Sequence, residues 1–213
     1  MLKRMIAVGD IHGCFDLLET MVERTIGFAS DEDTLVFMGD YIDRGKDNKK
    51  VVLYLAALKE KYPGSVILLK GNHEEMAYNV LTADDPSKQM FFWGLNGGND
   101  TIISFGGFEQ TREYLIPFID SLQLYYENDT HIFVHAGIPR GKDVSTATSE
   151  ELLWDRDFGY NGKKILVVGH TPKSTVGYFC GGKIICVDTG AYTTGILSAY
   201  DVNNNKIYKA ERK

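Results

Sequence analysis

The sequence contains little cysteine and no long apolar run. Its three cysteines, Cys14, Cys180 and Cys186, are an odd number and form no C-x-x-C pair. This pattern disfavours a disulfide scaffold or a thiolate zinc site, and it is typical of a protein kept reduced in the cytoplasm. Four consecutive apolar residues follow the N-terminal charges, too few for a secretory signal, and no stretch approaches the roughly 20 apolar residues of a membrane span. We therefore expect a cytoplasmic protein without membrane contact.

An excess of positive charge is also absent. The net charge is −6, which argues against nucleic-acid binding through a broad basic surface. The composition, 44% hydrophobic and 24% charged, is close to that of average soluble proteins. A chain of 213 residues fits one compact domain, so we expect a single domain over residues 1–213. The sequence contains no indication of oligomeric state.

Five short runs rich in valine and isoleucine each end in a polar or glycine-containing segment, which predicts buried strands. They cover residues 5–8, 34–38, 66–69, 132–134 and 165–168. Between the first three runs, residues 15–26 and 51–58 carry apolar side chains at helical spacing. Alternating strands and helices predict a parallel sheet with crossover helices.

The segment from about residue 79 to 124 follows a different pattern. It contains an aromatic cluster, two glycine pairs and one helix-like run at 108–124, which together indicate an insertion or cap beside the sheet. After residue 171 the pattern changes to short strands joined by turns. We expect these strands at 176–180, 184–187, 195–202 and 206–210.

An aspartate, asparagine or histidine follows each of the five predicted strands, at the sheet edge where ligands collect in α/β proteins. Asp10 and His12 are two residues apart, so in an extended backbone both face the same way and suit a divalent metal. Asp40 follows the second strand, and one carboxylate can bridge two cations ~3.5–4 Å apart. The later strand ends supply Asn72, His135 and His170. Each residue alone is more often structural, but the set predicts a binuclear metal site.

Two other candidates for chemistry are expected to be structural. His131 lies at the start of a predicted strand, unlike the other four histidines, which lie in the strand-end segments. Cys14 is close to His12, but a small apolar packing role at the start of a helix suits it better.

The strand-end segments form a recognisable series: GDIHG at 9–13, GDYIDRG at 39–45, GNHE at 71–74, HAG at 135–137 and GHT at 169–171, followed by VDTGA at 187–191. In this order they resemble the metallophosphoesterases, and within them the phosphoprotein phosphatase family of serine/threonine phosphatases, especially its compact bacterial and bacteriophage members. The resemblance implies an α/β fold, an αβ-βα sandwich of two mixed sheets flanked by helices, with a small helical cap insertion at roughly 79–124.

The resemblance also implies ligand sets for two metal ions. Asp10, His12 and Asp40 would hold the first ion, with Asp40 bridging. The second ion would be held by Asp40, Asn72, His135 and His170. Nitrogen, carboxylate and amide donors fit manganese, iron or zinc, and from the family resemblance we expect two manganese ions.

Catalytic and phosphate-binding roles follow from the same resemblance. His73 would be the general acid that protonates the leaving alcohol, and Asp43 would orient it. The phosphate would be contacted by Arg44, Arg156 and Asn72. Arg156 lies in a less distinctive segment, LLWDR, and the alternative for its side chain is a surface ion pair. The reaction implied is direct attack on phosphorus by a water or hydroxide bridging two metals. No strand-end segment contains the C-x₅-R loop of thiol-dependent phosphatases, which favours this route.

We therefore expect a metal-dependent phosphomonoesterase, a serine/threonine phosphatase type of enzyme acting on a phosphorylated protein, peptide or small phosphoester. A dinucleoside polyphosphate hydrolase is the first alternative, because that group shares the same segments; GDYIDRG and GNHE favour the phosphatase. A catalytically silent phosphate-binding module and a nuclease-like diesterase are further alternatives. HAG replaces the HGG of larger eukaryotic relatives, and the chain has little room for surfaces that dock regulatory subunits. Substrate choice is expected to reside in the insertion at 79–124.

Overall fold

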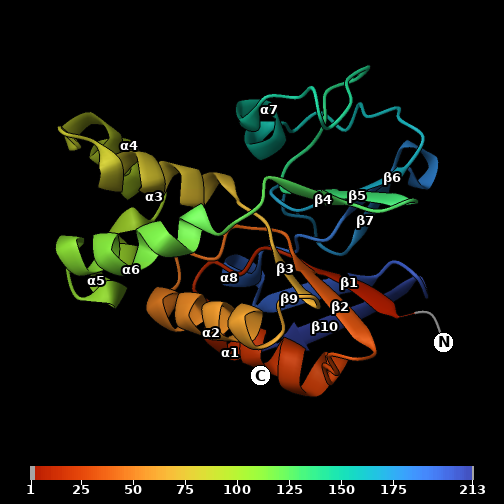
Figure 1. Ribbon diagram of the computed structural model, residues 1–213, viewed down its shortest axis with the longest axis horizontal. Helices are drawn as coiled ribbons and strands as arrows, with labels where there is room; N and C mark the ends of the chain where they lie inside the picture. The colour runs from red at the N-terminus through yellow and green to blue at the C-terminus, as the bar shows by residue number, and fades with distance from the viewer. Residues whose placement is uncertain (1–2, 213) are drawn as a thin grey trace.

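The fold is a sandwich of two five-stranded sheets with helices on both outer faces (Figure 1). A computed structural model describes residues 3–212. The strands of the first sheet are β1 (Arg4–Val8), β2 (Asp33–Phe37), β3 (Val66–Leu68), β9 (Ile196–Asp201) and β10 (Lys206–Glu211). Those of the second sheet are β4 (Tyr125–Glu127), β5 (His131–Val134), β6 (Ile165–Val168), β7 (Gly177–Phe179) and β8 (Ile184–Cys186).

Helices lie over both sheets and at one end of the sandwich (Figure 1). The first sheet is covered by α1 (Phe15–Glu19), which continues as the π-helix η1 (Thr20–Ile26), and by α2 (Asn48–Lys61). At one end of the sandwich lie α3 (Asn72–Thr82), α4 (Ser87–Leu95), α5 (Gly98–Phe105) and α6 (Phe108–Asp120). The remaining short helices are α7 (Ser149–Trp154), the 3₁₀ turn η2 (Cys180–Gly182) and α8 (Ala191–Thr194).

Both sheets are mixed: each has three neighbouring parallel strands, to which two antiparallel strands are added. The first sheet has the order β10-β9-β1-β2-β3, in which β1, β2 and β3 are parallel. The second has the order β4-β5-β6-β8-β7, in which β5, β6 and β8 are parallel. The pairs β7–β8 and β9–β10 are antiparallel. The predicted parallel core with crossover helices and the predicted late hairpins are confirmed.

Alternation along the strands separates the core into layers, because successive side chains of a strand point to opposite faces. Ile6 and Val8 pack under the helices, whereas Ala7 between them faces the second sheet. On β6, Val167 faces inward, while its neighbour Leu166 packs beneath α7. The apolar layer between the sheets holds the two sheets together and fixes which strand ends meet.

The insertion differs from the sequence prediction, which recognised one helix-like run at 108–124. It contains three helices, and the last ends at Asp120, before the short strand β4. Glycines break the helices: Gly97, Gly106 and Gly107 have φ values of 101°, 93° and 132°, which L side chains rarely adopt. Strand β4 and helices α4, α5, α7 and α8 are too short to give a clear periodic signal.

Within residues 3–212, no helix combines the length and the apolar character needed to cross a lipid bilayer.

Candidate functional site

Loops at the carboxyl ends of strands from both sheets meet in one polar pocket. Segments following β1, β2 and β3 come from the first sheet, and segments following β6 and β8 come from the second. The lining includes Asp10, His12, Asp40, Asn72, His73 and His170. His135, which follows β5, is fully buried behind them. The structure therefore brings together all six residues predicted as metal ligands.

Several of these residues have a left-handed backbone, which costs a non-glycine residue ~1–2 kcal/mol. The φ values are 45° for His12, 52° for Asp40, 72° for Asp43, 65° for Arg44 and 63° for His170. Such strain concentrates at functional sites, where the surrounding structure holds it in place. It also corrects one expectation: β1 ends at Val8, so the segment that contains His12 is turned and not extended.

Asp40 lies at the centre of the site, with each carboxylate oxygen facing a different histidine. Its Oδ2 is 3.4 Å from His12 Nε2, and its Oδ1 is 3.4 Å from His135 Nε2. Two clusters have metal-ligand spacing, with donor atoms within 4.8 Å of one another: His12, Asp40 and His73, and Asp40, His135 and His170. Asp40 belongs to both clusters, as a bridging ligand must.

Hydrogen bonds to backbone carbonyls fix the orientation of two histidine rings. His12 Nδ1 donates to the carbonyl of Ile42 and His135 Nδ1 donates to that of Met38, each at 2.8 Å. A carbonyl oxygen can only accept, so each Nδ1 carries the proton and each Nε2 presents a lone pair. This arrangement is typical of metal-binding histidines.

Burial keeps these histidines neutral. It lowers the pKa of His12 to about 3 and that of His170 to about 3, and it also lowers the pKa of His135. A neutral imidazole is the form that binds a metal ion. At neutral pH, therefore, no proton has to leave these rings before a cation binds.

The surroundings of two histidine nitrogens show that the donors fit a divalent cation. His170 Nε2 is buried and has no hydrogen-bond partner among residues 3–212. His135 Nε2, which carries a lone pair, lies 3.0 Å from Asn72 Oδ1 and 3.4 Å from Asp40 Oδ1. Buried electron-pair donors that face one another are satisfied by a cation. The nitrogen, carboxylate and amide set suits manganese, iron or zinc.

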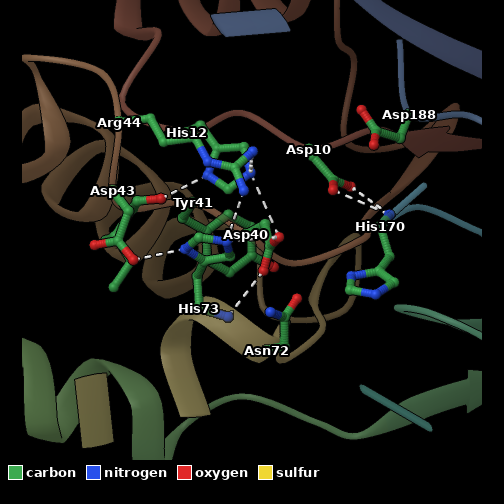
Figure 2. Close-up of polar contacts among 12 residues, drawn as sticks. Asp10, His12, Asp40, Tyr41, Asp43, Arg44, Asn72, His73, His170 and Asp188 are labelled. Atoms are coloured by element: carbon green, nitrogen blue, oxygen red, sulfur yellow. Dashed lines mark hydrogen bonds and ion pairs between the residues drawn. The ribbon is translucent and has the colours of Figure 1, made fainter. Parts of the chain in front are cut away.

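Asp10 occupies the same pocket but lies outside the two tight clusters. Its carboxylate accepts the backbone N–H of His170 at 3.0 and 3.3 Å, which links the loops after β1 and β6 (Figure 2). Beside it is a residue that sequence reasoning did not select: Asp188, in the VDTGA segment after β8, is buried and also lines the pocket. Burial raises the pKa of Asp188 to about 6. The strand-end rule, applied to β8, would have found it.

His73, a member of the first of the two metal-ligand clusters, forms a buried pair with Asp43. His73 Nδ1 is 2.6 Å from Asp43 Oδ2 (Figure 2). Although burial acts to lower the pKa of His73, the carboxylates of Asp40 and Asp43 outweigh it and raise that pKa above its ordinary value. Arg44 extends over both histidines: its Nη1 is 3.1 Å from His12 Nε2, and its Nη2 is 3.1 Å from His73 Nε2.

Arg156 lies in the pocket, near the second metal-ligand cluster. Its Nη1 donates to the carbonyl of His170 at 3.2 Å and to Thr171 Oγ1 at 3.4 Å. Trp154, two residues earlier at the end of α7, lines the pocket as well. The structure thus places a second guanidinium within the same pocket as Arg44.

Glu74 was not selected from the sequence, yet it ties two site loops together. Its carboxylate accepts the backbone N–H groups of Asp40 at 2.9 Å, Tyr41 at 2.8 Å and Gly71 at 2.9 Å. It is the third residue of α3, and the bond to Gly71 is the reciprocal half of a helix capping box. The glutamate of the GNHE segment was the available signal.

The two residues expected to be structural lie outside the pocket lining. His131 is on β5, where its Nδ1 is 2.8 Å from the hydroxyl of Thr130. Cys14 is buried in the apolar core beneath the helices.

Residues 3–203 match the family model of the calcineurin-like phosphoesterases, so the chain belongs to that family. It is a metallophosphoesterase, a hydrolase, and the resemblance inferred from the sequence is confirmed. Curated relatives include two proteins of Salmonella typhimurium. Serine/threonine-protein phosphatase 2 is 30% identical, with 94% of this chain and 93% of the relative covered. Serine/threonine-protein phosphatase 1 is 32% identical, with 92% and 90% covered.

Solved structures share the fold at low sequence identity. A structure provisionally described as a diadenosine tetraphosphatase has a TM-score of 0.75 and 19% identity, covering 100% of this chain and 95% of the other. A protein serine/threonine phosphatase from Saccharomyces cerevisiae has a TM-score of 0.73 and 18% identity, covering 99% and 80%. The predicted αβ-βα sandwich is confirmed.

Proposed function

We propose that this enzyme is a serine/threonine protein phosphatase. The observation that carries the proposal is the position of Asp40, which is shared by two metal-ligand clusters, one of which contains His73 of the buried His73–Asp43 pair. Relatives named serine/threonine-protein phosphatases align over nearly the whole chain, which supports the same activity. We further propose that the protein acts as a single domain in the cytoplasm.

The proposed metal centre uses the six converging side chains. Asp10, His12 and Asp40 would hold one cation, and Asp40, Asn72, His135 and His170 would hold the other, with manganese as the proposed ion. When bound, two divalent cations lower the pKa of a water molecule, orient it, and neutralise charge on the phosphoryl oxygens. His12 and His135 contribute Nε2 lone pairs whose direction is already set by the carbonyl contacts of Nδ1.

The remaining residues act on the phosphate and the leaving group. His73 donates a proton from Nε2 to the departing alkoxide oxygen, while Asp43 holds Nδ1 and favours the protonated ring. Arg44 offers two N–H groups in a planar fork that matches two phosphoryl oxygens. Arg156 and Asn72 line the same pocket and would also contact the phosphate.

A substrate comparison tests this proposal. Hydrolysis of a phosphothreonine peptide and of diadenosine tetraphosphate is measured with the manganese-loaded protein, with Asp40→Asn as the inactive control. The proposal expects kcat/KM for the peptide to exceed that for the dinucleotide. Efficient cleavage of the dinucleotide alone would replace the phosphatase by the alternative, a dinucleoside polyphosphate hydrolase, which the overall similarity to the diadenosine tetraphosphatase structure favours.

A further inference from the structure

Besides its contact with His73, the carboxylate of Asp43 is held by two residues of the helical insertion. Trp93 Nε1 donates to both oxygens, at 3.0 Å to Oδ1 and 2.9 Å to Oδ2. Thr101 Oγ1 donates to Oδ1 at 2.6 Å. We infer that Trp93 on α4 and Thr101 on α5 are positioning residues for the general acid. This inference rests on the proposed role of His73.

The hydroxyl of Thr101 makes two bonds to the same residue. It donates to the Asp43 carboxylate, and it accepts the Asp43 backbone N–H at 3.0 Å. The backbone of Asp43 is left-handed, with a φ of 72°, and this second bond stabilises that conformation. Thr101 therefore fixes both the side chain and the main chain of Asp43.

These bonds matter because all three residues are fully buried. A buried carboxylate without donors is strongly destabilised, so its oxygens turn toward whatever donors surround it. Trp93 and Thr101 supply those donors and so fix the carboxylate in the position where Oδ2 contacts His73 Nδ1. Without them Asp43 is free to rotate, and the ring of His73 loses its fixed orientation.

Two glycines at the junction of α4 and α5 allow close contacts with Trp93 and Arg44. A Cβ atom at Gly98 would lie 2.4 Å from the Trp93 ring, and one at Gly97 would lie 2.6 Å from the backbone N of Arg44. Gly97 also has a φ of 101°. Only glycines allow the loop to press against both the indole and the phosphate-binding arginine. The insertion thus supports the chemistry itself, in addition to the substrate choice expected of it.

The test compares variants that remove the hydrogen bonds made to Asp43 by one residue at a time, with a serine variant that keeps the hydroxyl. Thr101→Val deletes the hydroxyl, Thr101→Ser retains it, and Trp93→Phe removes the indole N–H. Each is assayed on a phosphothreonine peptide, whose leaving alcohol needs a proton, and on p-nitrophenyl phosphate, whose leaving group needs little assistance. Thr101→Val and Trp93→Phe should lower kcat on the peptide by about 10-fold or more, and on p-nitrophenyl phosphate by less than about 3-fold. KM and metal content should stay at wild-type values, and Thr101→Ser should recover most of the peptide activity.

A matched control comes from the same insertion. Thr111 is equally buried, but its hydroxyl donates to the carbonyl of Gly107, away from Asp43. Thr111→Val should keep the wild-type ratio between the two substrates. The inference is overturned if Thr101→Val lowers kcat equally on both substrates or leaves both kcat values unchanged. It is also overturned if Thr101→Val and Thr111→Val give the same ratio of the two kcat values. Should Thr101→Val fail to fold, Trp93→Phe carries the same comparison.

A reference variant separates this inference from the proposed function. If His73→Asn itself shows no dependence on the leaving group, the assignment of the acid is wrong. If His73→Asn shows that dependence and the Thr101 and Trp93 variants do not, the acid stands and only the positioning role is wrong.

Discussion

Replacing His73 by asparagine isolates the proton that the proposed mechanism delivers to the leaving group. The asparagine amide nitrogen occupies roughly the position of the ring Nδ1, so Asp43 keeps a donor where it now has one at 2.6 Å. The substitution removes Nε2, the atom on the pocket side. It therefore deletes the acid without leaving the buried carboxylate uncompensated, which would itself cost ~3–5 kcal/mol.

The expected loss depends on the leaving group. General acid catalysis contributes ~10²–10⁴-fold, and each tenfold step corresponds to about 1.4 kcal/mol of barrier. Because the carboxylates of Asp40 and Asp43 raise the pKa of His73, the protonated ring is populated near neutral pH and the contribution is available there. We expect kcat to fall by roughly 10³-fold on a phosphothreonine peptide and by about 10-fold or less on p-nitrophenyl phosphate. KM should change little, because Arg44 and Arg156, the proposed phosphate-binding residues, are both retained.

The assay is steady-state kinetics on both substrates, with metal content measured on the same samples. His131→Asn is the control, because His131 lies on β5 outside the pocket lining. In the wild type, a raised pKa means that the acid is lost only as the pH rises through a value above the ordinary one of about 6.5. The peptide kcat should decline there, and that decline should disappear in the asparagine variant. Equal losses on both substrates would refute His73 as the acid.

Two further predictions concern the cations and the phosphate. Asp40→Asn should abolish activity and lower bound manganese, measured by elemental analysis, below that of the wild type, because Asp40 belongs to both ligand clusters; full metal content with full activity would remove Asp40 from the bridge. Arg44→Lys should lower kcat/KM by about 10²-fold, since one ammonium replaces a planar pair of donors; a change within about threefold would show that the fork of Arg44 does not bind the phosphate.

Much of the site was predictable because strand ends are legible in a sequence. Short valine- and isoleucine-rich runs end in turn residues, and parallel topology brings those ends to one edge, so Asp40 and His170 were expected together although 130 positions separate them in the sequence. The late hairpins followed from their turn residues for the same reason. These signals are local and repeat along the chain.

The parts that could not be predicted depend on packing between distant segments. Trp93 and Thr101 contact Asp43 across separations of 50 and 58 residues, and no spacing rule connects them. The left-handed backbone of His12 is imposed by its surroundings, against the preference of the residue itself. Glu74 lies in the GNHE segment, but its bonds to Asp40 and Tyr41 appear only when the loops are assembled.

The proposed ligands come from both halves of the sandwich, since Asp40 follows a strand of the first sheet whereas His135 and His170 follow strands of the second. A cation coordinated by these residues would connect the two sheets directly. Loss of the cation would separate the site loops of the two sheets before the apolar layer between the sheets unfolds. The affinity for the cation and the stability of the contact between the sheets are therefore linked. A substitution that lowers the affinity should also make the two sheets separate more readily.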